Sequence, residues 1–93
     1  LLDAVDALYR AGWVAHAWTN LGGVAPVLFR LHRDSDAAVV VGACEASDLT
    51  TFKTAELPDE ARHALEHDPE LVESRMLGAR LSVPEVLRLL ATP

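Results

Sequence analysis

Three apolar segments follow one another closely in the first half of the chain, and each is apolar at nearly every position. They span residues 13–18, 24–29 and 37–44. A strand with one face in water should alternate apolar and polar residues, so a sheet built from these segments needs cover on both faces. The polar breaks at residues 20–23 and 32–36 are too short for a crossover helix. The three segments therefore predict an antiparallel meander.

Helical spacing precedes and follows this predicted sheet. Leu2, Val5 and Leu8 recur at intervals of three residues, and Gly12 then offers a C-cap. Later in the chain, Pro58 suits the first turn of a helix.

The pattern near the C-terminus predicts two more helices. Asp68 and Pro69 end the helix that begins near Pro58 and can cap another over residues 71–77, for which a fourth strand is the alternative. Residues 82–85, Ser-Val-Pro-Glu, fit a capping box that opens a final helix. The fold class that follows is a single α+β domain over residues 1–93. It has an N-terminal helix, a three-stranded meander and C-terminal helices packed on the sheet in two layers.

Such a sheet would leave one apolar face away from the helices, with a tryptophan on that face in either register. An exposed apolar patch of this kind indicates contact with a second copy or a partner protein. We therefore expect a non-catalytic protein-interaction or oligomerisation domain. Its expected contact residues are Trp13, His16, Trp18, Leu28 and Arg30. The alternative is that the C-terminal helices wrap around and cover the second face within one chain.

Composition restricts the class of protein. At 93 residues with 51% hydrophobic residues, the chain is long enough for one modest core and too apolar to be disordered. Its longest apolar run, about eight residues, falls far short of the roughly 20 that a transmembrane helix needs. The first six residues carry two aspartates and no basic residue, unlike a signal peptide. A single cysteine excludes an internal disulfide, which favours a cytoplasmic protein.

Charge is concentrated in the middle of the chain, within a net charge of −6. Residues 45–73 contain nine carboxylates against Lys53 and Arg62. This stretch repels phosphate backbones, so we expect no nucleic-acid partner. It suits either a solvated helix surface or an acidic antitoxin or immunity-type inhibitor that covers a basic protein.

One pattern suggests catalysis. Residues 42–46, Gly-Ala-Cys-Glu-Ala, follow an apolar segment and outline a nucleophile elbow around Cys44. A thiol nucleophile also needs a base, for which His16 and His32 are candidates. Such elbows belong to parallel sheets, and cysteine is usually a buried small hydrophobe. A small thiol-dependent enzyme or ligand-binding domain is therefore the competing class.

Metal and cofactor signals are weak. His63 and His67 lie one helical turn apart with Glu60 before them, but zinc sites usually need three or four ligands. Asp34, Asp36 and Glu45 flank the third apolar segment without the lysine of a nuclease core. There is no phosphate loop, dinucleotide fingerprint or paired-cysteine motif. We expect neither a metal nor a cofactor.

Overall fold

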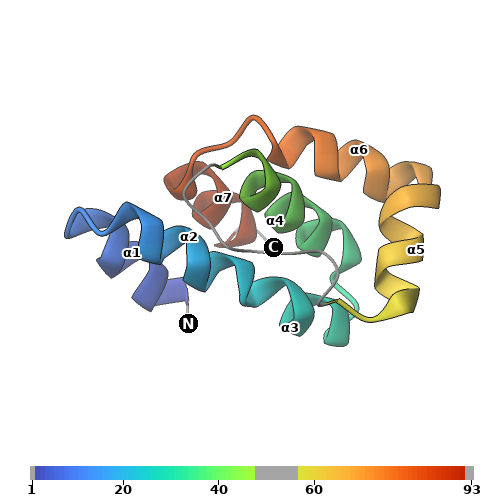
Figure 1. Ribbon diagram of the computed structural model, residues 1–93, viewed down its shortest axis with the longest axis horizontal. Coiled ribbons are helices and arrows are strands. Elements are labelled where there is room, and N and C mark those ends of the chain that lie inside the picture. The colour runs from blue at the N-terminus through green and yellow to red at the C-terminus, as the bar shows by residue number, and fades with distance from the viewer. Residues whose placement is uncertain (1, 48–56, 92–93) are drawn as a thin grey trace.

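The described part of the chain, residues 2–47 and 57–91 of a computed structural model, is helical and contains no strand (Figure 1). Its helices are α1 (Leu2–Arg10), α2 (Val14–Gly22), α3 (Val24–Arg30), α4 (Asp34–Ala46), α5 (Asp59–His67), α6 (Pro69–Gly78) and α7 (Val83–Ala91). The predicted α+β fold with a three-stranded meander is therefore wrong. Each of the three apolar segments expected to be a strand lies mainly in a helix.

Helix α4 lies at the centre of the molecule, which explains the apolar run that resembled a buried strand. Every residue from Ala37 to Cys44 is buried. Helix α6 makes the most extensive contact with α4, and α2, α3 and α7 also pack on it. A helix covered on all sides is apolar all round, so it loses the 3.6-residue period of a surface helix. Three of these eight residues are alanine, the residue with the highest helix propensity, and this composition agrees with a helix.

Helices α2 and α3 follow each other in nearly one line, where the sequence predicted a hairpin turn (Figure 1). Gly23, between them, keeps a right-handed helical backbone with φ −67° and ψ −14°. The break comes from Pro26, which has no N–H to donate and whose ring crowds the carbonyl of Gly22 four residues earlier. The turn at residues 20–23 is thus a kink within a helical segment.

The predicted C-cap at Gly12 is confirmed. Gly12 has φ +87°, and its N–H donates to the carbonyl of Tyr9 at 3.1 Å. The N–H of Trp13 donates to the carbonyl of Leu8 at 2.9 Å. This is the Schellman arrangement, in which a left-handed residue lets the chain reverse after a helix.

The corner between α3 and α4 repeats this arrangement with a histidine in place of the glycine. The N–H of His32 donates to the carbonyl of Phe29 at 3.1 Å, and that of Arg33 to the carbonyl of Leu28 at 2.9 Å. His32 has φ +60°, the left-handed region that favours glycine. The polar break predicted as a turn over residues 32–36 is a turn only at residues 32 and 33, where it joins two helices, and residues 34–36 form the first turn of α4.

Local signals correctly predicted the C-terminal helices. Asp68 caps α6, because its Oδ1 accepts the N–H of Glu70 at 3.0 Å, and residues 71–77 are helical. The capping box is also confirmed: the N–H of Ser82 donates to Oε1 of Glu85 at 3.0 Å, and the N–H of Glu85 donates to Oγ of Ser82 at 3.4 Å. These bonds satisfy backbone groups that a helix start leaves unpaired.

Helices α4 and α6 lie side by side (Figure 1), and their backbones approach closely at two glycines. A Cβ added at Gly42 would lie 1.9 Å from the carbonyl oxygen of Arg75, and one at Gly78 would lie 2.0 Å from that of Val39. This close approach therefore requires glycine at both positions. Beside it, the Arg75 guanidinium donates to both oxygens of Glu45 at 2.7 and 2.6 Å. This ion pair raises the pKa of Arg75.

The core draws residues from every helix and encloses one of the two tryptophans. Trp18 is 9% exposed and Leu28 is 5% exposed. They belong to one cluster with Val5, Leu21, Val40, Leu65, Leu71, Val83 and Val86. Trp13, in contrast, is 57% exposed. None of the described helices has the length and apolar character needed to cross a membrane.

Candidate functional site

The five predicted contact residues lie in three separate places. Trp13 and His16 meet at the start of α2, with ring centroids 5.2 Å apart and an angle of 66° between the rings. Trp18 and Leu28 are buried in the core. Arg30 is exposed and lines a groove between α3 and α5. The sheet face that was to unite these residues does not exist, so they form no single surface.

The groove between α3 and α5 encloses about 430 Å³ and is apolar over much of its lining. Phe29 and Ala64 are partly buried against the core, and Ala61 is buried. These small and aromatic side chains leave an open apolar floor. Charged residues border it. The full lining is Pro26, Phe29, Arg30, His32, Asp34, Pro58, Glu60, Ala61 and Ala64.

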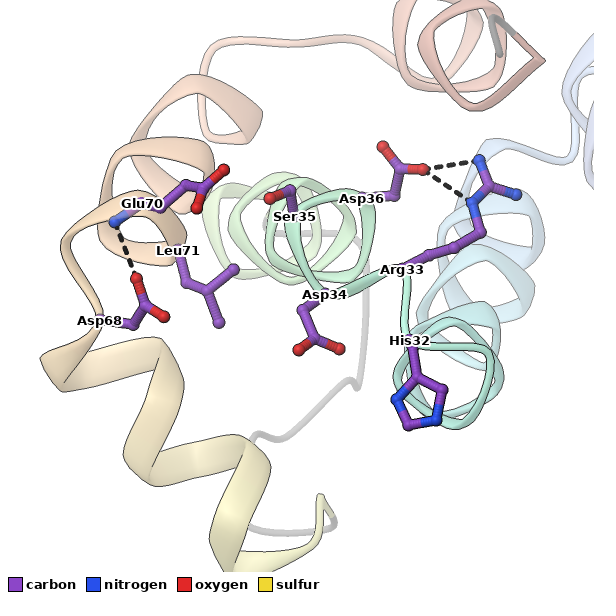
Figure 2. A pocket seen from close by; sticks show the side chains of 8 residues that line it. All are labelled: His32, Arg33, Asp34, Ser35, Asp36, Asp68, Glu70 and Leu71. Atoms are coloured by element: carbon purple, nitrogen blue, oxygen red, sulfur yellow. Dashed lines mark hydrogen bonds and ion pairs between the residues drawn. The ribbon is translucent and has the colours of Figure 1, made fainter.

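A second hollow, of about 270 Å³, lies next to the groove and shares His32 and Asp34 with it. Figure 2 shows this hollow between the corner that joins α3 to α4 and the start of α6, with Asp34 and Asp68 on opposite sides. Its lining is polar: His32, Arg33, Asp34, Ser35, Asp36, Asp68, Glu70 and Leu71. The two hollows together form a surface that is apolar at one end and acidic at the other.

Two carboxylates of the acidic hollow already have partners. Asp36 accepts hydrogen bonds from the Arg33 guanidinium at 2.6 and 2.9 Å (Figure 2). Arg33 also donates to the carbonyl of Leu90 at 3.1 Å, which ties this corner to the end of α7. Asp68 accepts the backbone N–H of Glu70 as the cap of α6.

The other carboxylates of the two hollows have no counter-ion among the described residues. Within residues 2–47 and 57–91, no cation pairs with Asp34, Glu60 or Glu70. All three are exposed. Counted together, the linings hold five carboxylates against two guanidinium groups, and one of those guanidinium groups is committed to Asp36. The surface therefore has an excess of negative charge.

The geometry around Cys44 opposes nucleophilic chemistry. Cys44 is fully buried, and its Sγ donates to the backbone carbonyl of Trp18 at 3.9 Å. Burial, and then the neighbouring charge of Glu45, raises the pKa of the Cys44 thiol to about 12. The thiolate is the nucleophile, so this thiol is almost entirely in its unreactive form near neutral pH. The candidate bases His16 and His32 are both exposed.

The two histidines of α5 lie next to each other with their rings tilted by 42°. The rings of His63 and His67 have centroids 4.4 Å apart. In the part of the chain that the structure describes, no group of three or more His, Cys, Asp or Glu side chains is arranged to hold a metal ion. Asp34 and Asp36 lie in the first turn of α4 and Glu45 in its last, so these three acids do not share a site.

Sequence reasoning missed the apolar side of the groove, because it assigned residues 24–29 to a strand. Read with a helical period, Val24 and Leu28 share the buried side, and Phe29 and Arg30 turn away from it. That reading would have marked the outer face of α3. Nothing in the sequence indicated that α5 lies opposite it.

Comparison with protein-family models, with curated proteins and with solved structures finds no match to the chain. Function therefore has to be inferred from the shape, exposure and charge of the surface just described.

Proposed function

We propose that this chain is a non-catalytic protein-interaction domain that receives a partner in the groove between α3 and α5. The observation that carries the proposal is the apolar floor of that groove, formed by Phe29, Ala61 and Ala64 and open to solvent. Helix α3 also exposes Val27 (42%), and Leu31, the residue after it, is 62% exposed. Exposed apolar surface bordered by polar residues is typical of protein interfaces.

The energetics favour covering this surface. Complete burial of one leucine side chain contributes about 1.5–3 kcal/mol. A partner that fills the groove gains part of this from each apolar side chain that it covers there, and places its polar groups against Arg30 and Glu60 at the rim. The high pKa and burial of Cys44 support a non-catalytic role over a thiol-dependent one.

A protein partner is favoured over a second copy by the net charge of −6. An acidic inhibitor of a basic protein is one form of this function, since carboxylates predominate around the groove. We further propose a cytoplasmic location, because the single cysteine is a free thiol.

A photo-crosslinking amino acid in place of Ala64 tests the proposal in cells that express the chain. We expect one discrete crosslinked product from the groove position. The same amino acid in place of Met76, an exposed apolar residue of α6 outside the groove, is the matched control and should give none. No product from the groove position, or equal products from both, would refute a specific interface there.

A further inference from the structure

We infer that the partner segment is basic and apolar, with apolar side chains on the groove floor and Lys or Arg side chains over the acidic hollow beside it. This inference rests on the proposed function and adds the chemistry of the partner. Two features carry it: the apolar space between α3 and α5, and the unpaired carboxylates that continue from it.

The apolar floor of the groove calls for apolar anchoring side chains in the partner segment. Ala61 and Ala64 are one helical turn apart on α5, and Phe29 faces the same space from α3. Because the α5 residues are alanines, they leave room for the larger side chains of a visiting segment. Leucine- or phenylalanine-sized anchors that fill such a space are the usual source of affinity where a segment enters a groove between helices.

The carboxylates beside the groove determine the sign of the charge that the partner segment carries. Glu60 and Asp34 line the groove, and Asp34 also lines the acidic hollow, together with Glu70. None of the three has a cation partner among the described residues. Neighbouring carboxylates repel one another, so a cationic group placed among them relieves this repulsion and adds its own attraction. Figure 2 shows the Asp34 carboxylate pointing away from α4 into this space.

A second copy of the chain does not suit this surface. Each copy carries a net charge of −6 with a pI near 5.0, so two copies repel as they approach. A different protein with basic residues is attracted instead, and faster at low salt.

Two synthetic amphipathic peptides with the same leucine face test the inference, one with lysine and one with glutamate at its polar positions. Each is titrated into the ¹⁵N-labelled chain at low salt and followed by NMR. We expect the lysine peptide to cause saturable shifts of the Phe29, Ala61 and Ala64 amides, and the glutamate peptide to cause none. Added salt should weaken the lysine complex.

Charge-reversal variants then locate the interaction. Glu60→Lys should weaken binding of the lysine peptide by about three- to tenfold, the range for exchanging one exposed attraction for a repulsion. Arg30→Glu should strengthen it by a similar factor, because it removes a like charge from the rim. Glu73→Lys is the control, since it makes the same charge change at an exposed position of α6 outside both hollows. Far-UV circular dichroism checks that each variant is folded.

The outcomes separate the inference from the function on which it rests. If both peptides shift the groove amides equally, the basic partner is refuted and the interaction groove stands. If neither peptide shifts them, both are refuted. If Glu73→Lys weakens binding as much as Glu60→Lys does, the attraction is unspecific and the inference fails. It also fails if the resonances of these amides shift with increasing concentration of the chain in the absence of peptide, because a second copy then occupies the groove.

Discussion

Replacement of Gly42 by alanine should destabilise the fold, because the added methyl group would clash with the backbone of α6. The added Cβ would lie 1.9 Å from the backbone oxygen of Arg75 and 2.8 Å from its carbonyl carbon. A carbon and an oxygen in ordinary contact are about 3.3 Å apart or more. Helices α4 and α6 must therefore separate by about 1.4 Å, because the obstacle is backbone and cannot rotate away.

Two opposing terms set the magnitude. Alanine in a helix interior gains about 1 kcal/mol over glycine through its higher helix propensity. Overpacking a tight interface costs about 1–3 kcal/mol and occasionally more, and here the displaced atoms belong to the most extensive helix contact of the fold. We expect the cost to lie at the upper end of this range, about 3 kcal/mol, because the obstacle is backbone, and the net loss in the free energy of unfolding is then about 2 kcal/mol. For a domain of this size that loss lowers Tm by about 8–16 °C.

Urea and thermal unfolding, followed by circular dichroism at 222 nm, measure the loss. Gly23→Ala is the control, because Gly23 is exposed, has a right-handed helical backbone and leaves its added Cβ 3.3 Å from the nearest carbonyl oxygen. It should change stability by less than about 1 kcal/mol. Gly78→Ala should behave like Gly42→Ala, and the double variant should lose less than the sum of both, since one separation of the helices relieves both clashes. A Gly42→Ala protein as stable as the Gly23→Ala protein would refute the close approach of the two helices.

Three further predictions concern single residues. His32→Gly should raise the free energy of unfolding by about 1 kcal/mol, because glycine takes the left-handed conformation without strain, and a loss of stability in urea would contradict the corner geometry. Cys44, with a thiol pKa of about 12, should react with iodoacetamide at pH 8 only as fast as the protein unfolds, so rapid labelling of the native state would contradict its burial. The pKa of Glu85 is lowered, first by the hydrogen bond from the Ser82 N–H, so its folded form binds fewer protons than its unfolded form. Its stabilisation is present above the ordinary glutamate pKa of 4.5 and is lost as the pH falls through the lowered pKa of the folded form. Glu85→Gln should therefore be less stable than the parent at pH 7, and the two urea midpoints should converge once the pH is below the pKa of Glu85 in the folded form.

Trp18 was expected to be a contact residue on a free sheet face, whereas its side chain is 9% exposed within the core. Trp18→Glu should therefore unfold the protein. A carboxylate there would be buried among apolar residues at a cost of several kcal/mol. Loss of association in that variant would report unfolding and not the removal of a contact.

The sequence by itself determined three of the helix ends, because each of these ends is made by residues within a few positions of one another. Local hydrogen bonds form at each of these ends: at the Gly12 C-cap of α1, at Asp68 before α6, and in the capping box from Ser82 to Glu85. The acidic character and the single cysteine are likewise properties of the sequence alone.

Tertiary structure decided whether the apolar run from Ala37 to Cys44 is a strand or a helix. A strand buried on both faces and a helix buried all round give the same unbroken apolar pattern, and only the neighbours that cover it differ. Those neighbours include α6, whose close approach depends on Gly42 facing the backbone of Arg75 and Gly78 facing the backbone of Val39. The groove is a matter of tertiary structure for the same reason, since α3 and α5 are distant in sequence. They come to face each other because α3 packs on α4, α6 packs on α4, and α5 packs on α6.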